Sequence, residues 1–235
     1  MREPDNFKIK KVQKLSAEAQ TADALRDGIV SGEIPPGTRL TEIRMAEQLG
    51  VSRATLRTAF HQLVQEGLID QIPYTGWAVV SLSAEDSWEL YTLRSSLEAL
   101  GSKLVAAKMA DAGQSVAVRA KLDQVFDGLK EACATGSHRK IADADFALHR
   151  AIIDLSGHRR LAEQYSRVEQ QIRIYIASSD ALVPVPEVII EQHRPLIESL
   201  KAGDVDASIR AAVDHTEQEG AKLERHLREL EGADQ

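Results

Sequence analysis

The hydrophobic and polar positions in the first third of the chain predict three short helices. The first spans about 17–30 and ends where glycines and prolines interrupt the pattern. The second spans about 42–49, and Gly50 closes it. The third is capped by the side chain of Ser52 and runs to about Glu66. Its apolar residues recur at the spacing of a core-facing helix: Leu56, Ala59, Phe60, Leu63 and Val64.

A β-hairpin is predicted directly after the third helix. Two short apolar runs, 68–72 and 77–80, surround a turn that contains Pro73 and Gly76. Three helices followed by a hairpin are typical of a winged helix-turn-helix, which places its third helix in the major groove of DNA.

The rest of the chain keeps helical spacing, with little indication of strands. Five interruptions delimit about six helices, and they lie at 111–113, 135–138, 156–158, 184–186 and 203–204. We therefore expect a mainly α protein with an N-terminal tail (1–16), a winged helix-turn-helix (17–82) and an all-helical domain (83–235).

Composition narrows the class of protein. With 235 residues and 43% apolar content, the chain can bury a full core. Its single cysteine, Cys133, excludes an internal disulfide and a cysteine-based zinc site, as expected in a reducing cytosol. No apolar run approaches the ~20 residues that span a bilayer, and the N-terminus has no hydrophobic secretion signal. We expect a cytoplasmic protein with no membrane partner.

The net charge of −7 is unevenly distributed. Residues 1–82 carry 10 basic and 10 acidic side chains, whereas residues 83–235 carry 19 and 26. The acidity therefore belongs to the C-terminal part. A small N-terminal domain can keep a local basic face, and it is the local charge that sets affinity for phosphate.

Residues at the start of the third predicted helix suit DNA recognition. Arg53 and Arg57 are four residues apart on one face, and Ser52 and Thr55 lie beside them. Arginine donates two hydrogen bonds to guanine or grips a phosphate, and the helix N-terminus adds partial positive charge. The alternative is that the two arginines only solubilise an exposed helix. The turn before them and the wing after them favour DNA binding.

The stretches IVSGEIPPGTRLTE and AEQLGVSRATLRTAFHQLVQEGLI, with the wing glycine Gly76, resemble the N-terminal domain of GntR-family bacterial transcription regulators. The resemblance implies that Arg53 and Arg57 contact operator DNA and that the wing tip around Gly76 enters the adjacent minor groove. Many members carry an arginine where this chain has Ile43. Arg44, one place later, is a possible substitute for that backbone contact, although it is rotated by about 100°.

The helical remainder resembles the FCD-type ligand-sensing domain of the FadR subgroup. The resemblance lies in WELYTLRSSLEAL, DADFALHRAIIDLSGHRRL, EQHRPLIESLKAGDVDAS and AAVDHTEQE. It implies that an aspartate and three histidines bind a divalent metal, and the matching positions are Asp145, His149, His193 and His215.

The chemistry of these four residues is consistent with a metal site. Asp145 and His149 are four residues apart, so a helix presents both on one face, and His193 and His215 come from later helices that could close around the same point. Three neutral imidazoles and one carboxylate leave a bound M²⁺ with a net charge near +1, which suits a carboxylate effector. Zinc, nickel, manganese and iron are all admissible. Taken alone, Asp145 and His149 would be interpreted as an ion pair on a helix surface. His193 and His215 would be interpreted as core histidines.

Arg94 is the further candidate in the helical part. Related regulators use an arginine at this position to hold the acid group of an effector, so the resemblance implies an effector contact. The alternative is an ion pair with Glu98, four residues later on the same helix.

These observations predict a homodimeric transcription regulator, a repressor, that binds a two-fold-related operator in double-stranded DNA. A small organic acid bound in the helical domain, at the metal and Arg94, would change operator affinity. Two alternatives stay open: the same class of regulator sensing its effector without metal, and a metalloenzyme with a helical active site. Against an enzyme, no general base or nucleophile stands out near the four candidate ligands.

Overall fold

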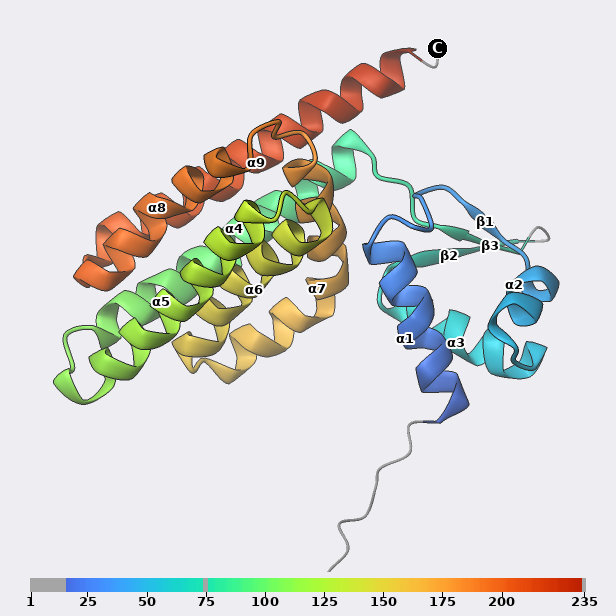
Figure 1. Cartoon of the computed structure of the whole chain (residues 1–235), viewed down its shortest axis with the longest axis horizontal. Helices are drawn as coiled ribbons and strands as arrows, with labels where there is room; N and C mark the ends of the chain where they lie inside the picture. Colours follow the sequence, from blue (N-terminus) through green and yellow to red (C-terminus); the bar gives the residue numbers. More distant parts are fainter. Residues whose placement is uncertain (1–15, 74–75, 234–235) are drawn as a thin grey trace, which may run out of the picture.

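A computed structural model describes residues 16–73 and 76–233, and within these ranges the protein is mainly helical (Figure 1). The N-terminal unit contains α1 (Ala17–Val30), β1 (Arg39–Leu40), α2 (Glu42–Leu49), α3 (Arg53–Gln65), β2 (Ile69–Ile72) and β3 (Gly76–Val79). The helical bundle contains α4 (Ala84–Lys108), α5 (Ala112–Ala134), α6 (His138–Ser156), α7 (Arg159–Asp180), α8 (Pro186–Ala202) and α9 (Val205–Ala233). The predicted fold class is confirmed. Apart from Ser16, the expected N-terminal tail lies outside the described residues.

Local sequence signals position the helices of the N-terminal unit. Ser16 and Ser52 accept backbone N–H groups at the starts of α1 and α3, and Gly50 ends α2 in the left-handed conformation at φ 66°. The wing was predicted incompletely, because β1 adds a third strand and the sheet order is β1-β3-β2. A two-residue strand has no alternating pattern to detect. It forms only because Leu40 pairs with Trp77 across the sheet.

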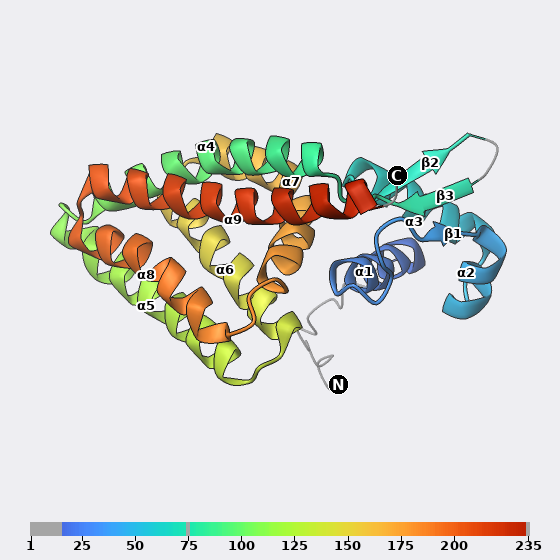
Figure 2. The same ribbon diagram turned by 90° about the horizontal axis from the view of Figure 1, so that it is seen from above.

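Within the helical bundle, α4 and α9 run side by side along most of their length (Figure 2). Their close approach depends on Gly220 in α9: a Cβ placed there would lie 2.7 Å from Cβ and Cγ of Tyr91 on α4. The Cβ of Tyr91 is bonded directly to the backbone of α4, so it cannot move without displacing that helix. Among the described residues, no helix is long and apolar enough to cross a membrane.

Gly220→Ala is therefore expected to destabilise the fold by about 1–3 kcal/mol, the usual cost of forcing extra atoms into a close-packed core. Gly128→Ala is the matched control, since nothing lies within 4 Å of a Cβ at that position in α5. It should be neutral or stabilise by up to about 1 kcal/mol through better helix propensity. Urea unfolding of both variants measures the difference, and equal stabilities would contradict the packing described.

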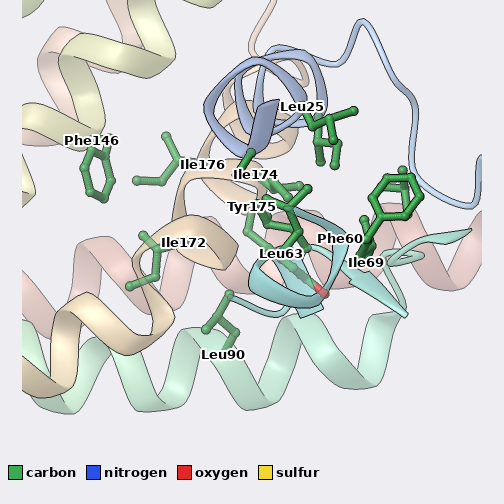
Figure 3. Close-up of a cluster of buried hydrophobic side chains, with 14 of the residues drawn as sticks. Leu25, Phe60, Leu63, Ile69, Leu90, Phe146, Ile172, Ile174, Tyr175 and Ile176 are labelled. Carbon is green, nitrogen blue, oxygen red and sulfur yellow. The ribbon is translucent and has the colours of Figure 1, made fainter. Parts of the chain in front are cut away.

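One hydrophobic cluster extends from the N-terminal unit into the helical bundle (Figure 3). Leu25 and Leu63 contribute from α1 and α3, and Ile174 and Tyr175 contribute from α7. A second cluster lies wholly within the bundle, among α4, α5, α6, α8 and α9. The N-terminal unit is therefore packed against the bundle mainly through α7.

Candidate metal centre and nucleic-acid interface

The two arginines predicted to contact DNA lie exposed at the start of α3, with side chains 64% (Arg53) and 56% (Arg57) accessible. Both face Glu42 of α2. Arg53 Nη2 lies 3.0 Å from Glu42 Oε2, and Arg57 Nε lies 3.5 Å from Glu42 Oε1. Trp77 Nε1 of the wing donates to the same carboxylate at 3.4 Å. Sequence reasoning missed Glu42, whose ion pairs hold both guanidinium groups on the exposed face of α3.

The remaining candidates for DNA contact surround this face. Ser52 caps α3, and its hydroxyl lies 2.9 Å from that of Thr55, so both side chains are at the helix N-terminus. Arg44 is exposed on α2, where Ile43 is also 60% exposed. Gly76 begins β3 at φ 111°, a conformation that favours glycine. Residues 74–75 of the wing lie outside the described residues.

The four candidate metal ligands come together inside the helical bundle. Asp145 and His149 lie on α6, His193 on α8 and His215 on α9. All four are buried, with His149 fully so. The interpretation of Asp145 and His149 as a helix-surface pair is therefore wrong, because the helices that bring the other two histidines also cover that face.

Distances among the donor atoms are short. His149 Nε2 lies 3.1 Å from His193 Nε2 and 3.2 Å from His215 Nε2. Asp145 places Oδ1 3.3 Å from His149 Nε2 and Oδ2 3.1 Å from His193 Nε2. One ligand atom from each of the three histidines lies within 4.8 Å of the others. Three nitrogens and a carboxylate thus converge on one point.

This geometry fits a metal ion. Two atoms each bound about 2.1 Å from one ion, at tetrahedral or octahedral angles, lie about 3.0–3.4 Å apart, and the measured separations are 3.1–3.3 Å. His193 donates through Nδ1 to the carbonyl oxygen of Ile189 at 2.7 Å, so its Nε2 faces the centre and presents a lone pair there when the ring is neutral. Lone pairs facing each other in a dry interior repel, and a bound cation removes that repulsion.

The charges of the four residues are suited to a cation. Burial acts to raise the pKa of Asp145, but His193 and His149 outweigh it and hold that pKa well below its usual range. Burial and the two neighbouring histidines hold the pKa of His215 well below its ordinary value, so this ring is neutral. For His193 burial acts to lower the pKa, and Asp145 raises it by more. The site thus holds an ionised carboxylate beside a neutral imidazole, a donor set that favours a cation.

A second layer of side chains surrounds His149, and sequence reasoning missed most of it. Glu98 Oε2 on α4 lies 2.7 Å from His149 Nδ1, although the two atoms are not aligned as a hydrogen bond. Glu98 Oε1 accepts from Arg94 Nε at 2.7 Å and from the Tyr165 hydroxyl at 2.9 Å. Burial acts to raise the pKa of Glu98, but Arg94 and His149 lower it to about 2. A carboxylate beside a ligating histidine orients the ring and strengthens it as a ligand.

Arg94 itself is buried, with 2% exposure. The ion pair with Glu98 that was the alternative to effector binding is present. The ion pair is made by Nε of Arg94. Nη2 of Arg94 is buried without a hydrogen-bond partner in the described part of the chain. A buried guanidinium with an unused donor costs free energy unless a partner is supplied, and an acid group would supply one.

Two further residues, at the two ends of α7, could not be assigned a role from the sequence. Asp180, at the end of α7, is buried with Oδ2 lacking a partner among the described residues, and burial together with Asp145 and Glu219 raises its pKa to about 9. His158 caps the start of α7: its Nδ1 accepts from the backbone N–H of Leu161 at 3.1 Å. It takes the place usually held by serine, threonine, aspartate or asparagine.

Comparison with known families decides the class of protein. Residues 17–79 match the bacterial regulatory proteins of the gntR family, and residues 89–218, more than half of the chain, match the FCD domain. The chain belongs to the GntR family. Its FCD domain agrees with the resemblance to the FadR subgroup. It is therefore a transcriptional regulator of the GntR family, a class that binds operator DNA.

Similar proteins carry the same architecture along most of their length. A Paenarthrobacter nicotinovorans protein named probable D-xylose utilization operon transcriptional repressor is 26% identical over 206 residues, 88% of each chain. The HTH-type regulator YdhC of Bacillus subtilis is 27% identical over 229 residues, 96% of this chain and 98% of YdhC. A GntR regulator from Rhodococcus sp. RHA1 shares the fold, with a TM-score of 0.72 and 24% identity over 88% of this chain and 96% of its own. Each of these proteins is named as a transcriptional regulator, the class predicted for this chain.

Proposed function

We propose that this GntR regulator is a homodimeric repressor whose operator affinity is controlled by a small carboxylate bound at a divalent metal. Residues 17–82 would read the operator, and residues 83–235 would sense the effector and form the dimer. The observation that carries the proposal is the convergence of Asp145, His149, His193 and His215 at separations suited to one ion. The relative from P. nicotinovorans is named a repressor, which supports that direction of regulation.

When bound, the ion would supply a positive charge and an open coordination position for a carboxylate oxygen. The protein's own residues orient a ligand of the ion and hold the acid. Glu98 holds the His149 ring in place, and the unused Nη2 of Arg94 offers a donor to the second oxygen of the acid. Because these groups are buried, their attraction for an anion is much less screened than it would be in water.

The proposed dimer has a candidate surface on α4. Leu93 and Leu100 are 46% and 39% exposed, respectively, and lie seven residues, about two turns, apart on one face of the helix. Large apolar side chains that gather on one element are typical of an interface. Such a dimer would present two copies of α3 to a two-fold-related operator.

A thermal-shift screen of carboxylates tests the proposed function. At a hundredfold excess over its Kd, an effector should add about 2.7 kcal/mol to the stability of the zinc-loaded protein. Its melting temperature should rise accordingly. The same acid should weaken binding to the operator. Arg94→Ala should lose the stabilisation while still binding zinc. An acid that stabilises metal-free protein equally would favour sensing without metal.

A further inference from the structure

A buried hydroxyl is one link between helix α7 and the candidate metal centre. Tyr165 is fully buried, and its hydroxyl donates to Glu98 Oε1 at 2.9 Å. The other oxygen of Glu98 lies 2.7 Å from His149. The Tyr165 ring also packs against Phe146 of α6, with ring centroids 6.5 Å apart. A movement of His149 on binding a metal would therefore be passed to Glu98 and from there to α7.

The same helix touches the N-terminal unit six residues further along. Gln171 lies against Gly67, between α3 and β2, so closely that a Cβ at Gly67 would lie 3.0 Å from Gln171 Cδ and nearer still to its Nε2. Gly67 has a φ of 68°, which favours glycine. Six helical residues span about 9 Å, so α7 joins the metal centre to the end of the DNA-reading helix over a short, rigid distance.

Two cavities adjoin α7 close to this contact. One, of about 220 Å³, is lined by Gly67, Gln171 and Ile174 together with residues of α4. The other, of about 720 Å³, lies between α1 and the helices α6 and α7, and Ile174 lines it too. A fully close-packed junction would resist a small displacement, whereas the space beside α7 at these cavities lets the helix shift against α1 and α3.

We infer that Glu98 and Tyr165 are positioning residues that couple the metal centre to α7, and that the Gln171–Gly67 contact passes the displacement to the N-terminal unit. The inference rests on the proposed metal site. Its competitor is a direct route through α4, which carries Arg94 and Glu98 and follows the wing in sequence. The two routes differ in one respect: only the first needs the Tyr165 hydroxyl.

Hydrogen–deuterium exchange of the full chain with Zn²⁺ alone tests the inference. In the wild type, saturating Zn²⁺ should slow exchange in α7 and in residues 23–30 and 66–72 by at least about fivefold, the lower range of coupling between sites. Tyr165→Phe should still bind Zn²⁺ by calorimetry but lose that slowing. Tyr175→Phe is the matched control: it removes a hydroxyl from the same helix that is not bonded to Glu98, and it should behave as the wild type. Gln171→Ala should keep the slowing in α7 and lose it in residues 66–72.

Each other outcome has a distinct meaning. Equal slowing in Tyr165→Phe and the wild type overturns the α7 route in favour of α4. Loss of the slowing in both tyrosine variants also overturns it, because the Glu98 hydrogen bond would not be the cause. Zn²⁺ binding without any change in exchange of the wild type removes the coupling but leaves the metal site. Failure of the wild type to bind Zn²⁺ removes the metal site itself.

Discussion

Replacing Arg53 and Arg57 together with alanine is expected to abolish specific operator retention. A bidentate arginine contact to a base contributes about 1–3 kcal/mol, so losing two from one chain should weaken binding by about 2–6 kcal/mol, or roughly 30-fold to 10⁴-fold, and losing them from both chains of a dimer should weaken it further. Folding should be unaffected, because both side chains are exposed and their ion pairs with Glu42 are the kind that stabilise little. Electrophoretic retention of an operator selected from genomic fragments by the wild-type protein measures the loss.

Arg159→Ala is the control for this variant, since Arg159 is 78% exposed on α7 and lies in the helical bundle. It should retain the operator as the wild type does. The selected sequence should contain two half-sites related by a two-fold axis. Unchanged retention by the double variant would contradict the assignment of α3 as the reading helix, and a single isolated half-site would contradict the dimer.

Zinc is expected to stabilise the wild-type protein strongly and to leave His193→Gln unchanged. A ligand that binds only the folded state at a hundredfold excess over its Kd adds about 2.7 kcal/mol, which in a chain of this length corresponds to a rise of about 5–10 °C in melting temperature. His193→Gln removes one of the three converging nitrogens. Residues that only orient a ligand already cost 10–100-fold in metal affinity, so losing a ligand should cost at least about 100-fold.

His138→Gln is the matched control because this histidine is exposed at the start of α6, outside the cluster. It should show the same rise with zinc as the wild type, and chelation should reverse the rise in both. If His193→Gln were stabilised as much as His138→Gln, zinc would be binding elsewhere and the cluster would not be the site.

Features that depend on a few neighbouring residues could be predicted from the sequence. The caps Ser52 and Gly50 and the stripe of apolar residues in α3 are local, so the helix boundaries followed from them. Strand β1 could not be predicted, since its two residues are extended only because Trp77 pairs with Leu40.

Within the candidate site, spacing identified Asp145 and His149, and resemblance added His193 and His215. Burial of all four depends on how α6, α8 and α9 pack, which no spacing contains. Glu98 was visible four residues after Arg94, but only as a partner for that arginine. Its second contact, with His149, is made across two helices, and the buried carboxyl of Asp180 also becomes relevant only through tertiary packing.

The metal content of the protein purified without an affinity tag and without added metal tests the central claim most directly. About one divalent ion per chain is expected by elemental analysis of the wild type, with a large loss in a variant that combines Asp145→Asn with His193→Gln. Metal-free wild-type protein should take up one equivalent of Zn²⁺. Wild-type protein that contains no metal, and that takes up no more Zn²⁺ than the double variant, would contradict the metal-centred sensor.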